Sequence, residues 1–293
     1  AGRGLGARPE PPPTPGPARS DKIKNSEACG FKKFRSVAGE ERRHCVDDLH
    51  WEPLSRKISV LVSREHHFST DTILLAWFSR PKPGSRCADL GSGCGTIPLL
   101  WCRDKPPARI FAVELQENAC RQMRESIDRN GLSDIISAEH RDIRDLDSVK
   151  GDPLWQNLDL VACNPPYKAP GTGIPNPEES LRTARHEESC TMDDILRAAR
   201  MLLRTGGWFC LCQRPERLCD VLAGMRSFDL EPKRLRFVHQ RPGSAPSLFL
   251  AGGIRGGRPG GLAVEPPLFI ESPDGGDSDD MKQIYGDYRE IRA

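Results

Sequence analysis

Residues 86–95 read RCADLGSGCG and residues 109–114 read RIFAVE, and these two stretches decide the fold. Each contains a short apolar run of strand length, and the first run ends in a turn with glycine at every second position. A helical pattern from Thr96 to Arg103 lies between them. Strands separated by a helix imply a right-handed crossover, so the two runs are predicted to be parallel neighbours in one sheet.

The alternation of strand and helix continues along the chain. We expect further helices at Thr70–Arg80, stopped by Pro81 and Pro83, at Glu117–Asn130, closed by Gly131, and at Met192–Leu203, ended by Thr205-Gly206-Gly207. Further strands are expected at Ile58–Val62, Ile135–Glu139, Leu158–Cys163, Trp208–Cys212, Arg234–Gln240 and Ser247–Ala251. The last two have no room for a helix between them and should be antiparallel neighbours. The sequence therefore predicts an α/β fold with a doubly wound, mostly parallel, seven-stranded sheet that contains one antiparallel strand.

Two segments of biased composition are expected to lack regular structure. Residues 1–43 begin AGRGLGARPEPPPTPGPARS, which is too polar and proline-rich to bury apolar surface. We expect a disordered Pro/Gly/Arg-rich tail there, followed by one domain over residues 44–293; a tail that touches RNA is the less favoured alternative. Gly252–Gly261 is expected to be a flexible loop rather than a phosphate cradle, because no helix follows it.

The composition limits the classes of protein to which the chain can belong. No run of about 20 apolar residues exists, so no membrane span is expected, and the first residues lack the apolar centre of a secretory signal. The 11 cysteines lack the paired spacings of zinc sites, so we expect no metal and reduced, mostly buried cysteines in a cytoplasmic protein. The net charge of +2 neither demands nor excludes a nucleic-acid partner, and a monomer is compatible with the sequence.

Acidic residues stand at the ends of three consecutive predicted strands. Asp89 directly precedes the glycine turn, where it suits the ammonium of an amino acid-like ligand. Glu114 closes the next strand, where a carboxylate can accept both hydroxyls of a ribose, and Asp142 follows the third strand, where it can accept from an adenine amino group. A glycine turn alone also serves dinucleotides, and a lone acid at a strand end is often a helix N-cap. The combination favours a nucleoside that carries an amino-acid end.

The most specific motif is Asn164-Pro165-Pro166-Tyr167, directly after the predicted strand Leu158–Cys163. Two successive prolines stiffen the loop. The side-chain carbonyl of Asn164 and the backbone carbonyl of Pro165 can accept the two hydrogens of a substrate amino group, and Tyr167 offers a flat face for stacking. The motif predicts transfer of a methyl group to a planar amino nitrogen. A proline turn with a purely structural role is the less favoured interpretation.

With these motifs the chain resembles the class I S-adenosylmethionine-dependent amino-methyltransferases that carry Asn-Pro-Pro-Tyr. Segments outside the motifs are similar to those of the bacterial valine-tRNA (adenine-N6) methyltransferases, over residues 44–287. These segments are Val46–Leu49, His67–Ala76, Ala184–Glu187, Arg214–Leu218, Pro266–Ile270 and Met281–Gly286. The tail and Cys94 within the glycine turn depart from the family pattern.

The resemblance implies a Rossmann-like enzyme that transfers a methyl group from S-adenosylmethionine to N6 of the adenine next to the anticodon of valine tRNA. Such a base must leave its stack to reach the pocket. The implied catalytic residues are Asn164, Pro165, Pro166 and Tyr167. The implied cofactor contacts are Asp89, Gly91, Ser92, Gly93, Gly95, Glu114, Leu115, Asp142, Ile143 and Asn164.

Basic residues that can contact RNA phosphates occur late in the chain, although each taken alone is more often a solvated surface charge. They are Arg182, Arg185, His186, Arg234, Arg236, His239, Arg241, Arg255 and Arg258.

Three alternatives stay open at the level of the sequence. A protein glutamine N5-methyltransferase shares the tetrapeptide, but usually has a helical domain before it, for which the tail is too polar. An rRNA guanine-N2 methyltransferase shares it too, although the flanking segments argue against it. An RNA-binding protein on a decayed methyltransferase fold is disfavoured, because Asp89, Asn164 and the glycines are intact.

Overall fold

The computed structural model describes residues 49–153, 155–165, 190–288 and 291. The predicted tail, Pro166, Tyr167 and the basic residues Arg182, Arg185 and His186 lie outside this part of the chain. Within the described part, no helix is both long and apolar enough to span a bilayer.

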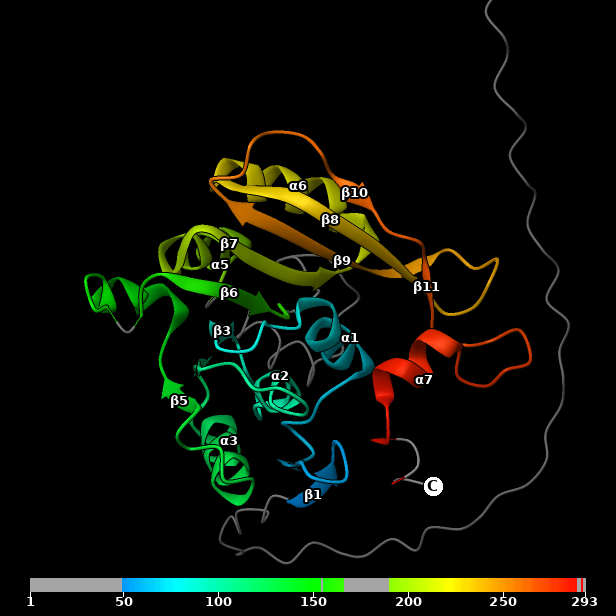
Figure 1. Ribbon diagram of the computed structural model, residues 1–293, viewed down its shortest axis with the longest axis horizontal. Coiled ribbons are helices and arrows are strands. Elements are labelled where there is room, and N and C mark those ends of the chain that lie inside the picture. Colours follow the sequence, from blue (N-terminus) through cyan, green and yellow to red (C-terminus); the bar gives the residue numbers. More distant parts are fainter. Residues whose placement is uncertain (1–48, 154, 166–189, 289–290, 292–293) are drawn as a thin grey trace, which may run out of the picture. The chain divides into compact units, whose positions relative to one another are not determined.

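One large twisted sheet organises the described residues (Figure 1). Its main strands follow the order β8 (Leu230–His239), β9 (Pro246–Arg255), β7 (Leu203–Gln213), β6 (Leu158–Cys163), β3 (Arg86–Leu90), β4 (Arg109–Glu114) and β5 (Ile136–His140). Only β9 runs antiparallel to its neighbours β7 and β8, while the pairs from β7 to β5 are parallel. The predicted doubly wound, mostly parallel sheet with one reversed strand is confirmed.

Two further strands, β10 (Ala263–Val264) and β11 (Leu268–Phe269), pair with β8 and bring the described sheet to nine strands rather than seven. Each is two residues long, so neither carries a periodic pattern that the sequence could reveal. A separate hairpin of β1 (His50–Pro53) and β2 (Ser59–Val62) was likewise predicted only in its second strand.

Alternate residues of the strands face two hydrophobic cores, one on each side of the sheet, because successive side chains of a strand point to opposite faces. Cys87 and Ile110 belong to the first core, while the residues that follow them, Ala88 and Phe111, belong to the second. The first core is covered by α1 (Thr70–Ser79), α2 (Thr96–Trp101), α3 (Glu117–Arg129), α7 (Asp279–Tyr285) and the β1–β2 hairpin. The second is covered by α5 (Met192–Leu202), α6 (Leu218–Ser227) and the 3-10 helix η1 (Ile143–Val149).

Thr205-Gly206-Gly207 was expected to end the helix that begins at Met192, but these residues lie in a strand that follows the helix directly. Helix α5 ends at Leu202, and all three residues belong to β7. A Cβ atom on Gly207 would lie 2.8 Å from the carbonyl oxygen of Leu158, so this glycine allows β7 to approach β6 closely.

The predicted Gly-rich loop also starts later than expected. Gly252 and Gly253 lie within β9, which continues to Arg255. A Cβ atom on Gly253 would lie 2.8 Å from the carbonyl oxygen of Leu230 and 2.6 Å from Cε of Met225, whereas one on Gly252 would meet nothing closer than 3.4 Å. Gly253 is therefore needed for packing rather than for flexibility.

Substitution of the two neighbouring glycines is expected to have different effects. Gly253→Ala should lower the free energy of unfolding by about 1–3 kcal/mol, because backbone atoms of β8 must move to admit the methyl group. Gly252→Ala is the matched control and should leave the free energy unchanged or raise it by up to about 1 kcal/mol. Urea titrations of both variants measure the difference; equal losses would contradict this account.

Candidate active site

The glycine turn between β3 and α2 is held against the neighbouring strand. The backbone N–H groups of Gly91 and Ser92 both donate to the carbonyl oxygen of Val113 at 2.9 Å. Gly91, Gly93 and Gly95 have φ values of +74°, +56° and +86°, a region that side chains with a Cβ atom rarely enter. A Cβ on Gly91 or Gly93 would meet open space, so these glycines leave the backbone accessible to a bound molecule.

Asp89 lies at the end of β3 with 0% of its surface exposed. Its Oδ2 atom accepts a hydrogen bond from the Ser92 hydroxyl at 2.6 Å, while Oδ1 is buried and has no hydrogen-bond partner among the described residues. Burial raises the pKa of Asp89 to about 7; the Ser92 hydrogen bond opposes this shift and the charge of Glu114 adds to it. An unpaired buried carboxylate oxygen is costly, and an ammonium donor would satisfy it. Asp89 thus fits an amino-acid end of a ligand.

Glu114, at the end of β4, fixes the turn from the other side. Its Oε2 atom accepts from the backbone N–H of Gly93 at 2.8 Å, and its Oε1 atom accepts from that of Gln116 at 2.7 Å. Each carboxylate oxygen retains a second lone pair, so acceptance of ribose hydroxyls stays a prediction. The contact with Gly93 joins residues 21 positions apart and was not predicted from the sequence.

Asp142 follows β5 and forms a forked ion pair with Arg144. Nε of Arg144 lies 3.0 Å from Oδ1 of Asp142, and Nη2 lies 2.5 Å from Oδ2. The hydrogen bonds from Arg144 lower the pKa of Asp142, which stays ionised. The predicted contacts Leu115 and Ile143 flank this region: Leu115 is exposed and Ile143 is half-buried. Arg144 was not among the predicted site residues.

Asn164 begins the loop after β6 and is contacted from two other elements. Its Nδ2 atom donates to the hydroxyl oxygen of Thr72 at 3.2 Å, and its Oδ1 atom accepts from the thiol of Cys212 at 3.0 Å. Since Cys163 pairs with Leu90, Asn164 lies at the same edge of the sheet as Asp89 and the glycine turn. Pro165 is buried. Neither Thr72 nor Cys212 was among the predicted site residues.

Several of the basic residues predicted as RNA contacts also interact with other residues of the fold. Arg234 pairs with Glu265 at 2.6 Å, and Arg236 pairs with Asp280 at 2.8 Å. Their guanidinium groups also lie over the rings of Phe78 and Trp77 respectively. Arg255 donates to the carbonyl oxygen of Leu203, and Nδ1 of His239 lies 2.7 Å from the carbonyl oxygen of Ser244. Arg241 and Arg258 are exposed and stay candidates for phosphate contacts.

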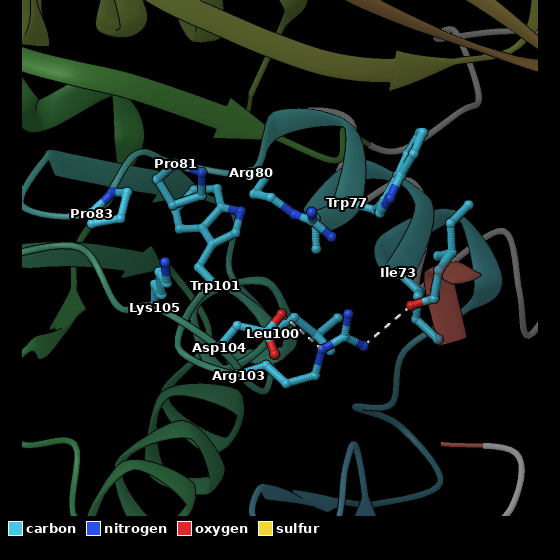
Figure 2. A pocket seen from close by; sticks show the side chains of 12 residues that line it. Ile73, Trp77, Arg80, Pro81, Pro83, Leu100, Trp101, Arg103, Asp104 and Lys105 are labelled. Carbon is cyan, nitrogen blue, oxygen red and sulfur yellow. Dashed lines mark hydrogen bonds and ion pairs between the residues drawn. The ribbon is translucent and has the colours of Figure 1, made fainter. Parts of the chain in front are cut away.

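A cavity of about 230 Å³ lies along α1, between α1, the end of α2 and α7 (Figure 2). Its lining includes Trp77, Trp101 and Arg103, none of which is a predicted site residue. Arg103 donates to the carbonyl oxygens of Ile284 and Tyr285, so it holds the end of α7. Among the residues that the structure describes, no group of three His, Cys, Asp or Glu side chains could hold a metal ion.

Comparisons with known proteins point to one family. The family model described as methyltransferase small domain matches residues 62–223. A tRNA1(Val) (adenine(37)-N6)-methyltransferase of Aeromonas hydrophila is 30% identical over 73% of this chain and 86% of its own length. The protein of the same name from Porphyromonas gingivalis is 29% identical over 69% of this chain and 78% of its own length.

Among solved structures, the fold is similar to that of a predicted O-methyltransferase from Agrobacterium tumefaciens. The TM-score is 0.56 at 19% identity, over 74% of this chain and 95% of that protein. This likeness supports the fold alone. On the family model and the curated relatives, the chain belongs to the methyltransferase small domain family and, within it, to the family of the tRNA1(Val) (adenine(37)-N6)-methyltransferases.

Proposed function

We propose that the protein transfers a methyl group from S-adenosylmethionine to the N6 amino group of an adenine in tRNA, next to the anticodon of valine tRNA. The observation that carries the proposal is the pairing of β3 with β6, which brings the unpartnered carboxylate oxygen of Asp89 and the side chain of Asn164 to one edge of the sheet. In this proposal residues 44–293 form one catalytic domain that works in the cytoplasm, where tRNA is found.

The cofactor is held by residues that already surround the glycine turn. Asp89 binds its ammonium group, Glu114 accepts from its ribose hydroxyls, and Asp142 accepts from its adenine amino group. The backbone at Gly91, Ser92, Gly93 and Gly95 approaches it closely, and Leu115 and Ile143 supply apolar contacts. When bound, the cofactor supplies a methyl group on a sulfonium cation, so the protein needs no strong base.

The target amino group is held by the loop after β6. Oδ1 of Asn164 and the carbonyl oxygen of Pro165 each accept a hydrogen bond from this amino group. The two hydrogen bonds draw the nitrogen toward sp³ geometry, so its lone pair is no longer delocalised into the ring. The rate then comes from alignment and electrostatics. Pro166 and Tyr167 complete this loop in the proposal, with Tyr167 stacking on the base.

The charge state of Asp89 is expected to control cofactor binding. Because burial raises its pKa to about 7, the carboxylate form that attracts an ammonium group is lost as the pH falls through this value. We expect the Kd of S-adenosylmethionine to rise about tenfold from pH 8 to pH 6, because the ionised fraction of a carboxyl group with this pKa falls about tenfold over that interval. Calorimetry at both values checks this. Asp89→Asn should bind weakly with little pH dependence, and Ser92→Ala should move the midpoint upward. A pH-independent Kd in the wild type would contradict the assignment.

Asn164→Ala is expected to lower kcat by about 100-fold or more, because one of two preorganised acceptors for the target amino group is lost. Cofactor affinity should stay close to that of the wild type, which calorimetry measures as the control. Retention of normal kcat would remove Asn164 from the proposed reaction.

The acceptor can be identified directly. We expect nucleoside mass spectrometry of valine tRNA, incubated with the protein and labelled S-adenosylmethionine, to detect N6-methyladenosine. A transcript with guanine in place of the adenine next to the anticodon is the control and should gain no label. Production of N2-methylguanosine, or of N5-methylglutamine in a protein, would replace the proposed substrate.

A further inference from the structure

The side chain of Asn164 lies between helix α1, which precedes it in the sequence, and strand β7, which follows it. Thr72 belongs to the first turn of α1 and accepts from Nδ2 at 3.2 Å. Cys212 belongs to β7 and donates its thiol hydrogen to Oδ1 at 3.0 Å. Each end of the carboxamide thus has its own partner.

These two partners favour one orientation of the carboxamide. A thiol has a single hydrogen to donate and its sulfur is only a weak acceptor, so Cys212 selects the oxygen of Asn164 rather than the nitrogen. The Thr72 hydroxyl oxygen can accept from Nδ2, which lies at the other end of the same group. A carboxamide turned by 180° would set Nδ2 against the thiol and lose a good hydrogen bond.

Both partners stand on rigid supports. Cys212 has 0% of its surface exposed and packs in the first core. Helix α1 buries Ile73, Leu74 and Leu75 in the same core. It is also tied to α2, because Nε1 of Trp101 donates to the Ser79 hydroxyl at 3.1 Å. Side chains held on packed elements keep their geometry better than those on loops, and Asn164 itself lies in a loop.

We propose that Thr72 and Cys212 are positioning residues, which keep Oδ1 of Asn164 in the orientation that accepts a hydrogen of the target amino group. This inference rests on the proposed function, in which Asn164 contacts the target. A thiol donates only one hydrogen, so the hydrogen bond from Cys212 occupies one of the two lone pairs of Oδ1. The hydrogen bond at Nδ2 raises the negative charge on Oδ1, since hydrogen bonds in a chain polarise one another.

The chain offers a matched pair of variants at β7. Cys210 and Cys212 lie two residues apart, face the same core and are both buried, but the thiol of Cys210 makes no hydrogen bond to a described residue. Cys212→Ala and Cys210→Ala remove the same atom from similar surroundings, so their losses of stability should be similar. Only Cys212→Ala should lower kcat, by about fivefold, as expected for the loss of one hydrogen bond. The KM for tRNA and the Kd of S-adenosylmethionine should change less than about twofold.

A second pair of variants tests the helix side. Thr72→Val preserves the shape of the side chain and removes the hydroxyl, and we expect kcat to fall about fivefold with KM unchanged. Thr72→Ser retains the hydroxyl and should restore most of the rate, which a purely structural role of the threonine methyl group would not predict.

An NMR measurement separates this inference from the proposed substrate. The side-chain amide protons of Asn164, assigned through their loss in Asn164→Ala, should exchange with solvent about fivefold faster in Thr72→Val than in the wild type or Thr72→Ser. Faster exchange without any methylation of tRNA would uphold the positioning and reject the substrate. Unchanged exchange, or an equal loss of kcat in Cys210→Ala and Cys212→Ala, would overturn the positioning.

Discussion

The hydrogen bond from the Gly93 N–H to the Glu114 carboxylate is the interaction on which the candidate site depends. It joins the glycine turn after β3 to the end of β4, and the two hydrogen bonds to Val113 reinforce the same junction. Burial of a carboxylate costs free energy unless its oxygens are hydrogen-bonded. Backbone N–H groups donate to both oxygens of Glu114, whereas Oδ1 of Asp89 has no hydrogen-bond partner among the described residues. The turn is thereby shaped for a ligand before the ligand arrives.

The fold was largely predictable because its signals are local. Strands β3 and β6 have the predicted bounds, and the four predicted helices begin at the predicted residues. Helices α6 and α7 were not predicted. The failures have physical causes. Two-residue strands such as β10 carry no pattern, and glycines that allow strands to pack closely, such as Gly207 and Gly253, look the same in sequence as glycines that end helices or form loops.

The candidate site, like the fold, could be predicted only in part. The acids and Asn164 could be proposed because strand ends meet at one edge of a sheet, which topology alone dictates. Their partners could not, because Thr72 lies 92 positions from Asn164 and Cys212 lies 48 positions from it. Arg144 is only two residues from Asp142, yet its pairing depends on a turn geometry that the residue types do not specify. Arg234 and Arg236 had the charge that RNA contacts require, but the acids that neutralise them come from later segments of the chain.

The position of α7 has a consequence for biosynthesis. All the proposed catalytic and cofactor-binding residues precede Arg214, but Met281, Ile284 and Tyr285 complete the core that supports α1. A growing chain therefore has every proposed catalytic group outside the ribosome while the part of the first core that α7 covers is still exposed. Such exposed apolar surface favours aggregation and chaperone binding until α7 is made. The synthesis of α7 thus sets the time at which α1 can settle into its final packing.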